Sequence, residues 1–134
     1  MTTFVQVSIG ELIDKITILS IKLARITENK KLINIQKEYD MLNQSLSKIY
    51  TVNDLDKEQI VTLTETLKNV NETIWDIENK KRYHESIKDF GSDFIELARG
   101  VYKQNDERAR IKRVINDLYN SEIIEEKCHI LNHS

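Results

Sequence analysis

The stretch SIGELIDKITILSIKLARI, residues 8–26, decides the fold class of this chain. Its first four residues fit a capping box, in which the Ser8 hydroxyl accepts from the amide of Glu11 while the glutamate reaches back to the cap. Behind this start, apolar residues recur at spacings of three and four, the period of one face of an α-helix. They are Ile9, Leu12, Ile16, Leu19, Leu23 and Ile26. We therefore expect a helix that begins at residue 9 and ends near residue 27.

The same apolar spacing recurs three more times along the chain, over residues 32–49, 60–77 and 94–118. Residues 88–92, Lys-Asp-Phe-Gly-Ser, separate the last two of these segments with a glycine and possible caps. The chain has no proline and three glycines in 134 residues, so the residues that interrupt helices are scarce. The sequence predicts an all-α fold, a four-helix bundle made of two α-hairpins, in a single domain over residues 1–134.

Two short stretches rich in β-branched residues flank the predicted helices, at residues 4–7 and 123–130. They could pair as a short terminal β-ribbon, or the tail could be irregular. The first helix also carries Ile18 and Ile21 on the side away from its apolar seam. This second face needs a cover, either from the terminal segments or from another subunit, and we expect a homodimer.

Composition and charge exclude several classes of protein. Apolar residues make up 40% of the chain and charged residues 31%, which is typical of a folded globular domain. The net charge of −2 does not favour nucleic acid as a partner, and no apolar run approaches the ~18 residues of a membrane span. Cys128 is the single cysteine, so no intramolecular disulfide can form. With no signal-peptide pattern at the N-terminus, we expect a cytoplasmic protein.

Several pieces of the sequence resemble a known family. They are residues 5–19, 89–91 with 94–99, 101–103 with 105–106, and 125–127. Together they are similar to a small uncharacterised all-helical family, a domain of unknown function in bacteria and their viruses. The resemblance spans essentially the whole chain and implies no activity.

Polar residues interrupt the last apolar seam at Gln104 and Arg108, where the other helices carry aliphatic residues. Lys112 lies one turn further on, and Tyr102 and Asn105 are near enough to share a pocket. Since arginine suits bidentate recognition of carboxylate or phosphate, this stripe predicts a site for a small anionic ligand. We favour the alternative that the arginine forms an internal ion pair with Glu72, Asp76 or Glu78 of the third helix, or lies at a hairpin edge with its charge in water.

Two pairs of carboxylates three residues apart are candidates for a magnesium site. Glu11 and Asp14 lie on the first predicted helix, and Asp93 and Glu96 lie on the fourth. Hard oxygen ligands suit Mg²⁺, which can activate water and bind phosphate. The competing explanation is that Glu11 serves the capping box and that Asp93 serves the first turn of its helix.

The sequence therefore leaves the function unknown and leaves open whether the chain is an enzyme. The first hypothesis is a non-enzymatic helical interaction or ligand-binding domain without a cofactor, motivated by the four apolar seams. The alternative is a Mg²⁺-dependent phosphoanhydride hydrolase resembling the all-α nucleotide pyrophosphohydrolases. The hydrolase requires Glu11, Asp14, Asp93 and Glu96 to converge, whereas the binding domain requires only the packing.

Overall fold

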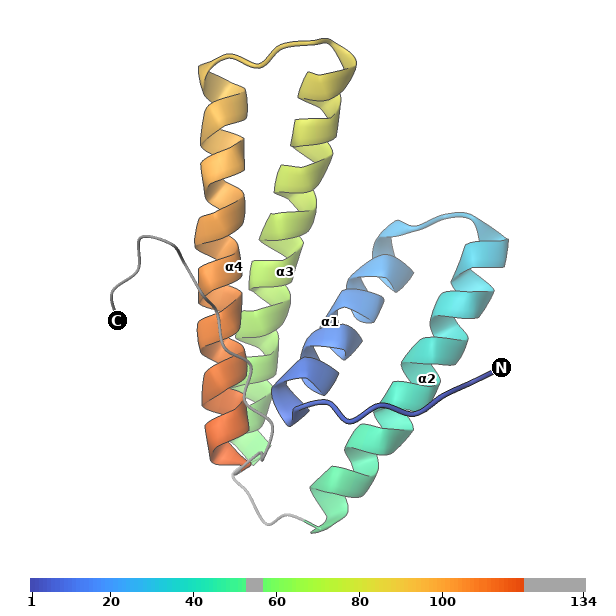
Figure 1. Ribbon diagram of the computed structural model, residues 1–134. Helices are drawn as coiled ribbons and strands as arrows, with labels where there is room; N and C mark the ends of the chain where they lie inside the picture. Colours follow the sequence, from blue (N-terminus) through green and yellow to red (C-terminus); the bar gives the residue numbers. More distant parts are fainter. Residues whose placement is uncertain (53–56, 120–134) are drawn as a thin grey trace.

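The computed structural model of the protein describes residues 1–52 and 57–119, and these residues form four α-helices (Figure 1). The helices are α1 (Ile9–Arg25), α2 (Asn29–Val52), α3 (Lys57–Ser86) and α4 (Ser92–Leu118). Each predicted helix is present within a few residues of its expected bounds. The predicted all-α four-helix bundle is confirmed.

The start of α1 shows the serine half of the predicted capping box, while the carboxylate of Glu11 lies 2.6 Å from Lys112 Nζ. The hydroxyl of Ser8, the N-cap residue, accepts a hydrogen bond from the backbone amide of Glu11 at 3.1 Å. Ser8 is 1% exposed, so this bond satisfies a buried helix end. The first residue of the fold-determining stretch therefore fixes where α1 begins.

The turn between α3 and α4 differs from the expected glycine break. Lys88, not Gly91, takes the left-handed conformation, with φ at 56°. The amide of Asp89 donates to the carbonyl of His84 at 3.0 Å, and the amide of Lys88 donates to the carbonyl of Glu85 at 3.2 Å. These are the two bonds of a Schellman motif, with Lys88 in the position usually occupied by glycine. Gly91 instead precedes α4 as its N-cap with a negative φ.

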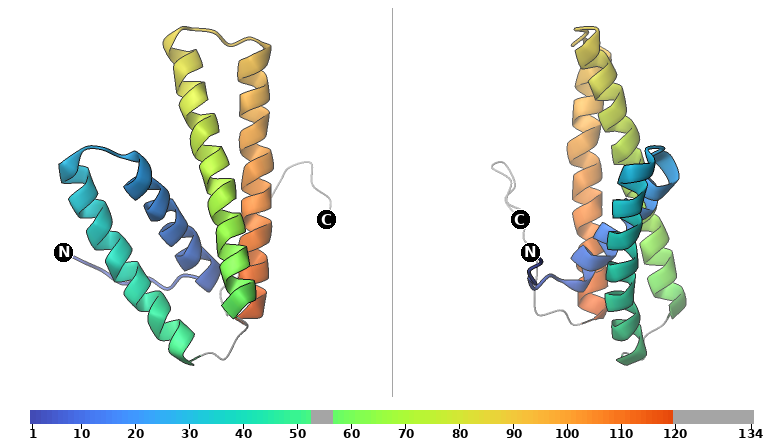
Figure 2. Two further views of the ribbon diagram at one scale, coloured as in Figure 1. Left: turned by 180° about the vertical axis from the view of Figure 1, so that it is seen from behind. Right: turned by 90° about the vertical axis from the view of Figure 1, so that its right-hand side faces the viewer.

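The helix α1 is the centre of the arrangement. It packs against α2, α3 and α4, whereas α2 lies against α1 and makes no close backbone approach to α3 or α4. The hairpin of α3 and α4 is longer than that of α1 and α2, and its far half projects beyond them (Figures 1 and 2). The two hairpins diverge toward this projecting end (Figure 1).

The hydrophobic core lies where α1 meets the lower half of the long hairpin. Four aliphatic side chains in it are at most 1% exposed, namely Ile13, Leu67, Ile111 and Ile115. Residues of α2 join the core mainly through Leu46, and partly buried side chains such as Leu42 pack around it. Because three helices pack on α1, it buries residues on nearly every side.

Two expectations about the outer surfaces need correction. The second face of α1 is partly buried within the described residues, because Ile21 is 2% exposed and packs beside α3, while Ile18 is half-buried. Ile21 therefore needs no cover from another subunit, and the expected homodimer stays a prediction. Residues 4–7 form no strand, and residues 123–130 lie outside the described residues, so that half of the proposed ribbon is not tested. Within the described helices, none is long and apolar enough to cross a membrane.

Candidate functional site

A fully buried carboxylate, that of Asp14 on α1, lies at the junction of three helices. Its side chain is 0% exposed and accepts from Arg108 of α4 in a two-pronged geometry. Arg108 Nε donates to Oδ1 at 2.9 Å, and Arg108 Nη2 donates to Oδ2. Such paired bonds between guanidinium and carboxylate are short, directional and roughly twice as strong as neutral ones. The pair therefore fixes α1 on α4 with a defined geometry.

A neutral amide from α3 completes the surroundings of this carboxylate. Asn71, 6% exposed, donates through Nδ2 to Asp14 Oδ1 and to Thr17 Oγ1, both at 2.9 Å. The Thr17 hydroxyl in turn donates to the carbonyl of Asp14 at 2.7 Å. Among the described residues, no buried side-chain nitrogen or oxygen lacks a hydrogen-bond partner. The desolvation cost of Asp14 is thus offset by a closed set of bonds.

Two further polar contacts join α1 to α4 below this pair. Lys112 Nζ donates to Glu11 Oε2 at 2.6 Å, with the lysine side chain only 12% exposed. The amide of Gly10 donates to Asn116 Oδ1 at 2.7 Å. A Cβ on Gly10 would lie 2.6 Å from the carbonyl oxygen of Lys112, so only glycine allows this approach. The first turns of α1 are therefore pressed onto the backbone of α4.

Above the buried pair, a groove of about 250 Å³ opens in the angle between α1 and α3. We call it the α1/α3 groove. Its apolar walls come from Ile18, Ile21, Ile74 and Trp75, and its polar lining comes from Asn71, Glu78, Asn79, Arg82 and Arg108. Apolar walls with a few convergent polar groups are the usual make-up of a small-molecule site. The two groups at its base, Asn71 and Arg108, are held in place by Asp14.

The predicted anion stripe on α4 is only partly assembled into this groove. Arg108 lines it, while Lys112 is engaged with Glu11 on the far side of Asp14. Gln104 and Asn105 are half-buried on α4 and Tyr102 is 56% exposed, and none of these three lines the groove. Ligand binding by these residues stays a prediction.

The internal ion pair expected for Arg108 exists, but its predicted partners were wrong. The arginine pairs with Asp14 of α1 and not with Glu72, Asp76 or Glu78 of α3. Two of those acids form ion pairs with Arg25 at the end of α1, whose guanidinium lies 2.5 Å from Asp76 and 3.6 Å from Glu72. These are contacts across the α1 and α3 interface.

The four carboxylates proposed for magnesium do not converge. Glu11 and Asp14 are engaged by cations of α4, as described above. Asp93 precedes Arg108 by fifteen residues on the same helix, which places it roughly 22 Å further along the axis at 1.5 Å per residue. Glu96 lies in the same distant turns and pairs with Arg99. In residues 1–52 and 57–119, no group of three or more histidine, cysteine or acidic residues is placed to hold a metal ion.

Sequence reasoning missed Asn71, Trp75 and Arg82 as lining residues of one groove. A usable signal existed for Asn71, which lies four residues after Leu67 and therefore near the buried seam of its helix. No such signal marks Arg82, which lies on an exposed part of α3 and cannot be told from other solvated cations by its sequence pattern. The groove depends on how α1 crosses α3, which no single-helix pattern contains.

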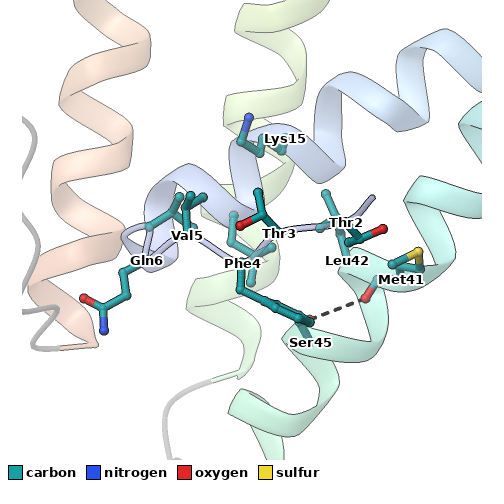
Figure 3. Close-up of a pocket in the computed structure, with 11 residues that line it drawn as sticks. Thr2, Thr3, Phe4, Val5, Gln6, Lys15, Met41, Leu42 and Ser45 are labelled. Carbon is teal, nitrogen blue, oxygen red and sulfur yellow. Dashed lines mark hydrogen bonds between the residues drawn. The ribbon is translucent and has the colours of Figure 1, made fainter.

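A second hollow, of about 680 Å³, lies where the N-terminal segment passes over α1 and α2 (Figure 3). Its lining is mostly apolar and includes Phe4, which is 94% exposed, together with Met41 and Leu42 of α2. Its one charged lining residue, Lys15, has its ammonium 3.5 Å from Glu11. With no convergent buried polar groups, this hollow is the weaker candidate for a specific site.

An aromatic pair closes the lower end of the bundle. Tyr50 of α2 stacks on Tyr119, which follows α4, with ring centroids 6.5 Å apart. Burial raises the pKa of Tyr119 to about 12, and the neighbouring Tyr50 adds to the rise. Burial likewise raises the pKa of Tyr50, while its hydrogen bond with Tyr119 opposes the change. Both phenols are therefore neutral around pH 7 and serve packing between α2 and the end of α4.

Comparison with known proteins identifies the family. The model of a family of unknown function, DUF6165, matches residues 3–133. The chain belongs to the DUF6165 family. No curated protein and no solved structure showed a significant match to it. The expectation of an uncharacterised family is confirmed, and the membership assigns no activity, so the functional argument rests on the geometry of the chain itself.

Proposed function

We propose that this DUF6165 chain is a non-enzymatic helical binding domain whose α1/α3 groove takes up a small ligand. The observation that carries the proposal is the buried Asp14 and Arg108 pair, which holds the base of an apolar groove in a fixed geometry. A preformed groove lowers the cost of ordering side chains on binding. The proposal needs no cofactor.

The charged groups of the groove favour binding over catalysis. A general acid or base must be placed to exchange a proton with a substrate. The two carboxylates at or beneath the groove are each engaged by a cation instead, Asp14 by Arg108 and Glu78 by Lys81 at 3.3 Å. This arrangement supports a role in recognition.

The test is a screen of small neutral, cationic and anionic fragments by chemical-shift perturbation on isotope-labelled protein. Binding at the α1/α3 groove should move the signals of Ile18, Ile74 and Trp75 together. Asn79→Phe, which places a ring at the rim, should abolish the shifts, while Lys80→Phe, one residue further and off the groove, should not. If no fragment of any charge perturbs these signals, the groove is not a binding site.

We also propose self-association, through the projecting end of the long hairpin and not through Ile18 and Ile21. Four large apolar residues are exposed there by 47% to 62%, namely Tyr83, Ile87, Phe90 and Ile95. Between Tyr83 and Phe90 the sequence also carries charges of both signs, Glu85 and Lys88, which suits a self-complementary twofold contact. Light scattering should show a dimer that Ile87→Glu dissociates and Val61→Glu, on an equally exposed site near the other end of α3, leaves intact. A monomeric parent would end this proposal.

A cytoplasmic location completes the proposal. It is supported by the single cysteine and the net charge of −2, which fit a reducing compartment and neither a membrane surface nor nucleic acid. Fractionation of cells that express a tagged full-length chain tests it.

A further inference from the structure

The α1/α3 groove has an apolar half and a charged rim. Ile18 and Ile21 of α1 face Ile74 and Trp75 of α3 across it. Its volume of about 250 Å³ is just below the roughly 300–1,000 Å³ of sites for drug-sized molecules. An occupant must therefore be a small molecule with an apolar body.

The charges around the groove do not cancel. Arg108 is neutralised by Asp14 beneath it, and Glu78 is neutralised by Lys81 on the same helix. Arg82 also lines the groove, and within the part of the chain that the structure describes it forms no ion pair. One positive charge is thus left at the rim, seven residues or about two helical turns after Trp75 on α3.

This pattern identifies a ligand class. We infer that the α1/α3 groove binds a small amphiphilic monoanion, an aromatic or branched carboxylate. Its apolar body lies against Trp75, Ile18 and Ile74, and its carboxylate is held by Arg82. Arginine presents a rigid fork that matches a carboxylate.

A single uncompensated cation favours a carboxylate over a phosphate. A phosphate group that carries nearly two charges would need a second cation, and Arg108 is already committed to a fully buried acid. Withdrawing Arg108 would leave Asp14 buried without its counter-ion. The inference rests on the proposed binding function but adds the chemistry of the ligand and the residue that selects it.

Trp75 makes the inference directly measurable, because it is the single tryptophan of the chain and lines the groove. The experiment titrates the full-length chain with 3-phenylpropionate and follows the emission of Trp75. The comparison probes are 3-phenylpropanol, which has the same body without the charge, acetate, which has the charge without the body, and inorganic phosphate. We expect saturable binding of 3-phenylpropionate and at least roughly tenfold weaker binding of each comparison probe.

Two matched variants separate the role of Arg82 from general charge. Arg82→Gln should weaken 3-phenylpropionate by at least roughly tenfold, as the loss of a hydrogen bond to a charged group implies. Lys80→Gln removes the same charge from the same exposed stretch of α3, but residues two apart on a helix do not share a face, so its affinity should equal that of the parent. Both sites are exposed, and equal melting temperatures would verify that the fold is intact.

The outcomes distinguish this inference from the proposed function. Equal binding of 3-phenylpropanol, or no effect of Arg82→Gln, would overturn the anionic ligand while the groove remained a binding site. Tighter binding of phosphate would also overturn it. If none of the probes saturates and neutral and cationic fragments also leave the groove unperturbed, the proposed function fails as well.

Discussion

Replacing Arg108 by methionine is the sharpest test of how this fold is held together. Methionine keeps the length and apolar stem of the side chain but removes the guanidinium, so Asp14 stays 0% exposed without its counter-ion. Of the side-chain bonds to its carboxylate described above, only that from Asn71 remains. Breaking a buried ion pair in this way typically costs ~3–5 kcal/mol. For a domain of this size that lowers the melting temperature on the order of 10–20 °C.

A matched control lies on the same helix. Arg99→Met removes an arginine whose pair with Glu96 is exposed, with both side chains at least 60% accessible. Exposed pairs of this kind contribute about 0–1 kcal/mol. Urea titration followed by circular dichroism, on the parent and both variants, gives the two differences in unfolding free energy on one scale.

A double variant separates the stranded charge from lost packing. Asp14→Leu with Arg108→Met removes both charges, and replacing a whole buried pair by apolar residues is often neutral. Asn71 still donates to Thr17 in that variant. The double variant should therefore be more stable than Arg108→Met alone. The reasoning is refuted if Arg108→Met melts at or above the parent, or if the double variant gains nothing over it.

Three further predictions follow from the packing and the buried phenol. Gly10→Ala should destabilise the fold by roughly 1–3 kcal/mol in a denaturant titration because its Cβ meets backbone of α4, whereas Gly100→Ala, which meets only the end of a flexible side chain, should be neutral or stabilising. Leu67→Ala, at 0% exposure, should cost roughly 2–5 kcal/mol and clearly more than Leu42→Ala, where the side chain is only partly buried. The raised pKa of Tyr119 contributes stability that is complete below about pH 10 and is lost as the pH rises toward 12, so Tyr119→Phe should flatten the fall in melting temperature over that window.

The helices were predictable because their signals are local. Ser8 as a cap and the three-and-four spacing after it act within one helix, so α1 begins where the sequence indicates. The turn at Lys88 shows where such reasoning fails, since the nearby Gly91 looked like the break. The hydrogen bond from Asp89 to His84 compensates a lysine in the left-handed region, and that bond exists only once the helix end has formed.

The partners in the site were not predictable from one sequence. Arg108 had plausible acids on every other helix, and which of them it meets depends on the angle at which α1 crosses the long hairpin. Glu72 and Asp76 were reasonable candidates, yet they form ion pairs with Arg25 of α1. The burial of Asp14 could not be predicted for the same reason. A charged residue between apolar neighbours has the same sequence pattern whether its side chain faces water or an arginine of another helix.

The order of the polar contacts explains how the groove gets its shape. Three residues in the first turns of α1 each contact one residue of α4. The pairs are Gly10 with Asn116, Glu11 with Lys112, and Asp14 with Arg108. The residue numbers rise along α1 and fall along α4 in steps of four, as in an antiparallel pair of helices. If α1 shifted by one turn along α4, Asp14 would lose its ion pair with Arg108. A residue with a side chain would also replace Gly10 at its close contact with the backbone of α4, where there is no room for a Cβ. Apolar packing alone tolerates such slips far better, because one aliphatic contact replaces another. We interpret the three contacts as the device that fixes the register of α1, and hence the angle with α3 in which the groove opens.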